Sequence, residues 1–237
     1  MRGRLAPAWH DFASRDALAS DLAATIVDRL RKAIDARGGA TLAVSGGTTP
    51  GLLFDTLSGA NLDWSKVAVT LVDERLVEPT SERSNERLVR ERLLRGEARL
   101  ARFVPLAPRD PSAEPDRAAK AAEAGVALLG QRLDVVILGM GADGHTASFF
   151  PDAADLDALL DPAQPHLVLP VIAQSAGEPR LTLTLPLIAS ARFLALHIEG
   201  AAKRSVFEEA ISSDAEALPI RRVLDATASR PHIYWTA

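Results

Sequence analysis

The chain has 237 residues, of which 47% are apolar and 24% are charged, and it contains no cysteine. This length is sufficient to bury a sizeable core, so we expect residues 1–237 to form a single α/β domain. The lack of cysteine excludes disulfides, thiolate catalysis and cysteine-ligated metal, and the formal net charge of −4 disfavours a general binder of nucleic acids or membrane surfaces.

The amino-terminal segment, residues 1–12, holds two arginines but no apolar run of the length that a signal peptide needs. No later segment approaches a membrane span. We therefore expect a cytoplasmic protein, a monomer or weak oligomer, with neither a nucleic-acid nor a membrane partner.

Residues 14–37 carry an apolar stripe with a spacing of about four, which predicts an amphipathic helix. The stripe consists of Leu18, Leu22, Ile26, Leu30 and Ile34. Gly38 and Gly39 are expected to end this helix.

The next predicted strand, residues 41–44, leads into Ser45-Gly46-Gly47-Thr48-Thr49-Pro50. We expect a helix to follow, with Thr49 as its N-cap and Pro50 at its first position. Small residues at a helix start allow a phosphate to approach free N–H groups, so Gly46, Gly47 and Thr48 are candidate phosphate ligands. An ordinary strand-to-helix turn remains an alternative, and the lack of Gly-Lys-Ser/Thr excludes a nucleotide P-loop.

Residues 67–72 form a predicted strand that delivers Asp73, Glu74 and Arg75 at its carboxyl end. These charges belong either to a site or to a solvated loop. A helix should start at a Ser84 cap and end at Gly96. A short strand at 103–104, a proline-rich surface connector over 105–115 and a helix over 116–129 are expected to follow.

The segment from Leu133 to Pro151, LDVVILGMGADGHTASFFP, is the one on which the chemistry is expected to depend. Its β-branched run predicts a strand buried on both faces, and its glycines present Asp143 and His145 at the carboxyl end of that strand. Residues 139–144 also match the pattern G-x-G-x-x-G, which is typical of dinucleotide-binding loops. A dinucleotide site is disfavoured, because Pro151 interrupts the expected helix and no acidic residue closes the next strand.

Further strands are predicted over 167–172, 181–185, 193–198 and 233–235, and helices after Pro186, over 201–211 and over 220–224. The alternation of strands and helices predicts a three-layer α/β/α fold around a doubly wound, mostly parallel sheet.

The chain lacks the sequence patterns that are typical of metal-dependent hydrolases and of serine-nucleophile enzymes. There is no H-E-x-x-H and no G-x-S-x-G, so general-base hydrolysis without a metal or cofactor remains. No pattern of acids and glycines like that around His145 surrounds His10, His166, His197 or His232, and we expect these four at the surface or satisfied in the core.

The segment 133–151 closely resembles the signature G-x-G-x-D-G-H-T-A-S-x-F-P of 6-phosphogluconolactonases, and it shares G-x-D-G-H with the related glucosamine-6-phosphate deaminases. The resemblance extends to SGGTTP at 45–50, VDER at 72–75, RLTLTLPLI at 180–188 and GAAKR at 200–204. It implies a Rossmann-like fold of the glucosamine-6-phosphate deaminase type.

The resemblance implies hydrolysis of 6-phospho-D-glucono-1,5-lactone to 6-phosphogluconate, the second step of the oxidative pentose phosphate pathway. His145 would take a proton from water, and Asp143 would orient the imidazole or a substrate hydroxyl. Arg75 and loop N–H groups would offset the oxyanion.

The substrate's phosphate would be held by Arg180 and Lys203, with Gly46, Gly47 and Thr48 on the other side. Lys203 lies near the start of a predicted helix, where the macrodipole disfavours a cation unless an anion is held nearby.

Two alternatives share parts of this pattern. Deaminases typically continue G-H-I-A-F-N-E-P, with a glutamate that assists the histidine, whereas this chain continues His145-Thr146-Ala147-Ser148-Phe149-Phe150-Pro151. A non-catalytic sugar-phosphate sensor would keep the phosphate turn, but no DNA-binding module accompanies this chain.

Overall fold

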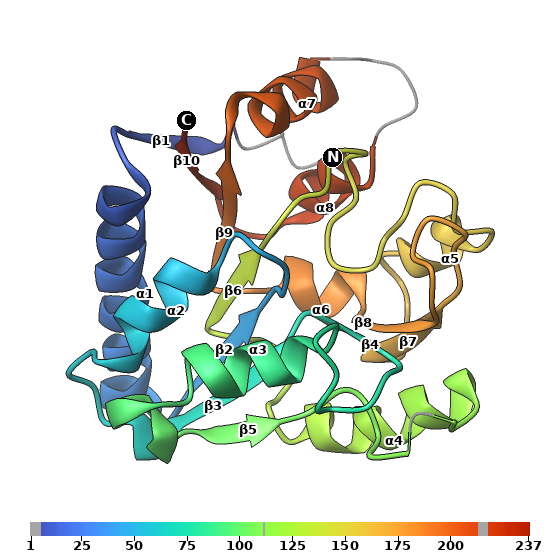
Figure 1. The fold of residues 1–237 in the computed structure, drawn as a ribbon, viewed down its shortest axis with the longest axis horizontal. Coiled ribbons are helices and arrows are strands. Elements are labelled where there is room, and N and C mark those ends of the chain that lie inside the picture. Colours follow the sequence, from blue (N-terminus) through green and yellow to red (C-terminus); the bar gives the residue numbers. More distant parts are fainter. Residues whose placement is uncertain (1–5, 111, 213–217) are drawn as a thin grey trace.

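The structure of the protein is a computed structural model that describes residues 6–110, 112–212 and 218–237. The predicted α/β fold is confirmed: helices flank a parallel sheet of seven strands (Figure 1). Every neighbouring pair in this sheet is parallel. In spatial order its strands are β1 (Ala8–Phe12), β10 (His232–Thr236), β9 (Phe193–Glu199), β6 (Val135–Leu138), β2 (Ala40–Val44), β3 (Val67–Leu71) and β5 (Arg102–Val104).

The long first helix, α1 (Arg15–Arg37), has both ends fixed by local chemistry. Ser14 Oγ accepts a hydrogen bond from the backbone N–H of Ala17, and Gly38 ends the helix in the left-handed conformation with φ 77°. The apolar stripe is buried and packs against β2, β6 and β10.

The other helices connect the strands across the two sides of the sheet. They are α2 (Gly51–Ser58), α3 (Asn85–Arg92), α4 (Pro115–Ala127), α5 (Leu156–Leu159), α6 (Leu185–Ala189), α7 (Ala201–Ser212) and α8 (Pro219–Ala226), with 3₁₀ turns η1 (Trp64–Lys66) and η2 (Gly96–Leu100). In Figure 1, α1 and α2 lie to the left of the main sheet, while α4 and α5 lie to its right.

The strand order reverses between β2 and β6. From β2 the chain builds outward through β3 to β5, and it then returns to β6 on the other side of β2 and builds outward through β9 to β10. Loops that leave neighbouring strands at such a switch point diverge and leave a crevice, which is where open α/β sheets bind ligands. Here those loops begin at Ser45 and Gly139.

A second, three-stranded antiparallel sheet was not predicted. Its order is β4 (Asp73–Arg75), β8 (Arg180–Leu183) and β7 (Val168–Val171). The periodicity of β7 and β8 identified them as strands but could not show that they leave the main sheet. Residues 73–75, a candidate solvated loop, are instead a strand with Asp73 and Glu74 buried.

Several predicted boundaries were wrong. The helix after the Ser45–Pro50 turn begins at Gly51, so Pro50 is its N-cap residue and Thr49 does not cap it. The helix capped by Ser84 ends at Arg92, and Gly96 begins η2. In the connector 105–115, Leu106 and Ala107 are buried, and residue 111 lies outside the described residues.

The strand β1 was missed because AWHDF lacks the apolar alternation of a half-buried strand. It pairs with β10 at the edge of the sheet. Within the described ranges, no helix combines the length and apolar character needed to cross a membrane.

Candidate active site

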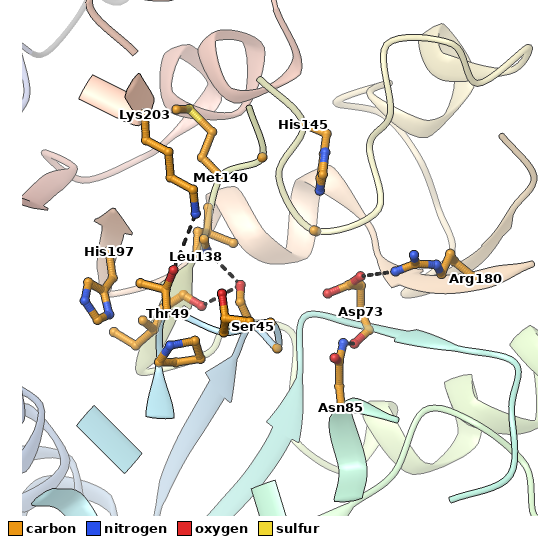
Figure 2. Close-up of a pocket in the computed structure, with 18 of the residues that line it drawn as sticks. Ser45, Thr49, Asp73, Asn85, Leu138, Met140, His145, Arg180, His197 and Lys203 are labelled. Atoms are coloured by element: carbon orange, nitrogen blue, oxygen red, sulfur yellow. Dashed lines mark hydrogen bonds and ion pairs between the residues drawn. The ribbon is translucent and has the colours of Figure 1, made fainter. Parts of the chain in front are cut away.

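A cavity of about 210 Å³ opens at the carboxyl edge of the main sheet, beside the switch point. Seven of the eight predicted site residues line it: Gly46, Gly47, Thr48, Arg75, His145, Arg180 and Lys203. The eighth, Asp143, does not line the cavity but contacts the His145 ring. Figure 2 shows this pocket, with His145 above it and Lys203 and Arg180 at opposite ends.

The loops from β2 and β6 are joined where they leave the sheet. Ser45 Oγ donates to the carbonyl of Ile137 at 3.1 Å and accepts from the N–H of Gly139 at 2.9 Å. Thr146 Oγ1 donates to the carbonyl of Gly139 at 2.7 Å. These bonds fix the Ser45–Pro50 turn relative to the loop that carries His145.

Gly46 is required because another side chain occupies the space a Cβ would need. A Cβ there would lie 1.8 Å from Asn85 Oδ1. Asn85 in turn donates through Nδ2 to the carbonyl of Asp73 at 2.9 Å, so the turn, β4 and α3 meet at this point. Gly46 and Gly47 line the cavity, and Asn85, which lines it too, takes the space that a side chain at Gly46 would need.

Lys203 lies beside this turn, not across the cavity from it. Its Nζ is 3.4 Å from Thr49 Oγ1. Burial lowers the pKa of Lys203, and the charge of Glu199 opposes that shift only in part. Among the described residues this half-buried ammonium has one long hydrogen bond, and such a group is suited to receive an anion.

His145 and Asp143 form a hydrogen-bonded pair. His145 Nδ1 lies 2.6 Å from Asp143 Oδ1, which also accepts from the backbone N–H of His145 at 3.2 Å. Partial burial opposes ionisation of Asp143, but its hydrogen bond and charge interaction with the His145 ring outweigh this and lower the pKa of the carboxyl. With Nδ1 engaged, Nε2 is the ring nitrogen left for the cavity.

At the other end of the cavity, Arg180 and Arg75 are cross-strand partners in the small sheet. Arg180 Nη1 is 3.8 Å from Asp73 Oδ2, and Nη2 donates to the carbonyl of Ala176 at 3.0 Å. Burial lowers the pKa of Arg180, which the charge of Asp73 opposes. Arg75 Nη1 donates to Asn85 Oδ1 at 3.0 Å.

Glu74 does not line the cavity but holds α3 in place. It is fully buried and accepts four hydrogen bonds, from the N–H groups of Arg75, Asn85 and Glu86 and from Ser84 Oγ. Burial raises the pKa of Glu74 in spite of these bonds. A carboxylate at the start of a helix satisfies its free N–H groups, and here it also positions Asn85.

Sequence reasoning missed several polar residues that line the cavity: Ser45, Thr49, Asp73, Asn85 and His197. Asp73 carried a signal, since it follows a buried strand. Asn85 carried none, because it reaches the cavity only through the docking of α3.

The expectation for the four remaining histidines was wrong for His197. His10 and His232 contact each other at 3.0 Å, and His166 is exposed. His197, by contrast, is 3% exposed, lines the cavity, and makes no hydrogen bond through either ring nitrogen to any residue that the structure describes.

No metal site accompanies these groups within residues 6–110, 112–212 and 218–237. There, no cluster of three or more histidine, aspartate or glutamate side chains has a geometry that could hold an ion.

Comparisons with known proteins agree on one family. The sequence profile of the glucosamine-6-phosphate isomerases/6-phosphogluconolactonase family matches residues 13–235. A 6-phosphogluconolactonase of Mesorhizobium japonicum is 53% identical over 227 residues, which cover 96% of this chain and 94% of that protein. One of Pseudomonas aeruginosa is 41% identical over 218 residues, with 92% and 90% covered. The crystal structure of a 6-phosphogluconolactonase from Shewanella baltica matches with a TM-score of 0.93 at 39% identity, covering 98% of each chain.

Proposed function

This chain belongs to the glucosamine-6-phosphate isomerase/6-phosphogluconolactonase family, and we propose that within it the chain hydrolyses 6-phospho-D-glucono-1,5-lactone to 6-phosphogluconate. The reaction is the second step of the oxidative pentose phosphate pathway. One observation supports the proposal most: His145, which is hydrogen-bonded to Asp143, lines the same cavity as Lys203 and the Ser45–Pro50 turn. A general base and an anion site are thus within the span of one sugar phosphate.

In the proposed reaction His145 is the general base. Nε2 takes a proton from a water molecule as its oxygen attacks the lactone carbonyl carbon, and a tetrahedral oxyanion forms. When the oxyanion collapses, the bond from this carbon to the ring oxygen breaks, and His145 returns the proton to that oxygen. Asp143 holds the ring through Nδ1 and stabilises the imidazolium between these two steps.

Lys203, Gly46, Gly47 and Thr48 bind the phosphate in this proposal. The backbone of the turn is accessible, and Lys203 Nζ lies on the same side, next to Thr49. Arg180, to which the family resemblance also gives a phosphate contact, lies at the opposite end of the cavity beside Asp73 (Figure 2). The position of Arg180 favours contact with the sugar of the substrate. Arg75 lies near it, and its positive charge offsets the oxyanion.

The test compares two substrates. The purified protein is given freshly prepared 6-phosphogluconolactone or, separately, glucosamine 6-phosphate, and the release of acid and of ammonia is measured against the uncatalysed background. We expect acid release alone, and turnover should survive exhaustive chelation. Ammonia release without acid release would replace the lactonase assignment by a deaminase one.

A further inference from the structure

His197 is a buried imidazole that pairs with Glu199 through one ring nitrogen and leaves the other without a partner among the described residues. It is 3% exposed, and neither ring nitrogen has a partner in strict hydrogen-bond geometry among the described residues. Nε2 lies 3.3 Å from Glu199 Oε1, outside strict hydrogen-bond geometry but close enough that the His197 ring lowers the pKa of Glu199, so Nδ1 is the ring nitrogen without a partner. Buried polar groups without partners are uncommon, because their desolvation is not compensated.

The ring lies at the phosphate end of the cavity. His197 is part of the cavity wall, and Figure 2 shows it on the same side as Lys203 and Thr49 and away from Arg180. A ligand anion held by Lys203 and the Ser45–Pro50 turn would therefore lie on this side. Such an anion can supply the acceptor that a ring N–H lacks.

The net positive charge around His197 is smaller than the double negative charge of a phosphate dianion. Lys203 from α7 and Arg15 from α1 are the cations, and Glu199 is the anion, with Arg15 Nε 3.0 Å from Glu199 Oε2. Arg204 of α7 is engaged by Asp11 and Glu208. The β10 partner of His197 is Tyr234, and β6 contains no ionisable residue.

Among the described residues, two cations against one carboxylate leave one net positive charge. A phosphate monoester carries nearly two negative charges above pH ~7, since its second pKa is about 6. One additional proton on His197 would balance it, and the resulting imidazolium would lie between Glu199 and the phosphate.

We infer that His197 is a proton-linked phosphate ligand, which takes up a proton when the phosphate dianion of the substrate or product binds and then donates a hydrogen bond to it. The inference rests on the proposed function for the nature of the ligand and for its orientation. His197 acts on binding and plays no part in the attack of water.

The experiment is calorimetric titration with 6-phosphogluconate, the reaction product, which binds without turnover. Titrations at pH 7.5 in buffers of low and high ionisation enthalpy give the number of protons taken up. We expect an uptake approaching about one proton per site for the wild-type protein, and an affinity that falls as pH rises from ~7 to ~9, where the ligand is already a dianion.

Three variants locate the proton. His197→Gln should abolish the uptake and raise Kd by about 10-fold or more. Lys203→Arg, which keeps the charge but cannot titrate in this range, should retain the uptake. His166→Gln, a substitution of an exposed histidine outside the cavity, should behave like the wild type.

Binding without proton uptake, or uptake that persists in a folded His197→Gln protein, would overturn the inference while the lactonase assignment stands. If His197→Gln does not fold by circular dichroism, His197→Asn replaces it and is interpreted in the same way. Failure of the proposed function is distinguishable, because wild-type protein would then neither bind 6-phosphogluconate nor release acid from the lactone.

Discussion

His145 depends on a carboxylate two positions earlier in the chain. Because hydrogen bonding and charge interaction with the ring hold the pKa of Asp143 below its usual 3.8, this carboxyl is ionised above that value and gains a proton only as pH falls through its lowered pKa. Asp143 therefore stays ionised throughout the neutral and mildly acidic pH range. A loss of activity near neutral pH is not due to Asp143.

Replacing His145 by alanine should remove the proton transfer but leave the phosphate contacts intact. We expect kcat to fall by about 10²–10⁴, the usual contribution of general acid–base catalysis, with KM little changed. Steady-state kinetics on fresh lactone measures both, with His166→Ala as the control. Activity within a few-fold of wild type would remove His145 from the mechanism.

Lys203 should act through binding and not through chemistry. Losing a charge-assisted hydrogen bond costs about 1.5–3 kcal/mol, so Lys203→Ala should lower kcat/KM for the phosphorylated lactone by roughly 10- to 150-fold. Unphosphorylated glucono-1,5-lactone, which lacks the contact, should be a poor wild-type substrate and lose little more. Equal proportional losses on the two lactones would place the phosphate elsewhere.

At the scale of elements, the loop after β6 is shaped around the His145–Asp143 pair. A Cβ on Gly141 would lie 2.3 Å from the His145 ring and 2.6 Å from Asp143 Oδ1. The backbone N–H of Gly141 also donates to the carbonyl of His145 at 2.9 Å, which closes the loop. Only glycine leaves room for both side chains inside it.

Gly141→Ala should therefore displace the pair without unfolding the protein, since the loop lies outside the strand. A misplacement of about 1 Å can cost ~10²-fold in rate, and we expect a loss in kcat of that order. Gly59→Ala is the matched control, because Gly59 has φ −99° and no atom near its added Cβ. Wild-type kcat in Gly141→Ala would show that the loop relaxes around the methyl group.

At the scale of the whole molecule, the two edges of the main sheet have different roles. The carboxyl edge carries the cavity, and the amino edge is held by Asp134, which is 7% exposed. Asp134 Oδ2 accepts from the N–H of Thr41 at 2.9 Å, and Oδ1 contacts Arg37 and, at 3.3 Å, Arg192 Nε. One carboxylate thus joins the starts of β2 and β6 and two cationic side chains.

Asp134→Ala should lower stability and leave catalysis unchanged. The Thr41 N–H loses its acceptor while the two arginines remain nearly half exposed to solvent, so we expect the free energy of unfolding to fall by about 1–3 kcal/mol. Urea denaturation measures this as a lower midpoint at constant slope. Asp28→Asn, which breaks an exposed pair with Lys32 on α1, should shift the midpoint little. A folded Asp134→Ala protein with reduced kcat would contradict this separation of the two edges.

The sequence by itself determined most of the elements, though not β1 or β4, and the residues with local signatures. The stripe from Leu18 to Ile34 predicted α1, the β-branched run predicted β6, and glycines with Asp143 and His145 marked the loop. These follow from periodicity and from backbone freedom, which act over a few residues and are therefore readable from neighbours. The family resemblance rested on the same local motifs.

Only the tertiary structure decided how these pieces meet. The order of strands places the ends of β2 and β6 together, the antiparallel pairing of β4 with β8 places Arg75 against Arg180, and the docking of α3 brings in Asn85. The same holds for His197, an ordinary position in an apolar strand until β9 aligns beside β6. These arrangements depend on contacts between residues far apart in the chain, where the energy of packing and pairing is shared over the whole core and no local pattern encodes it.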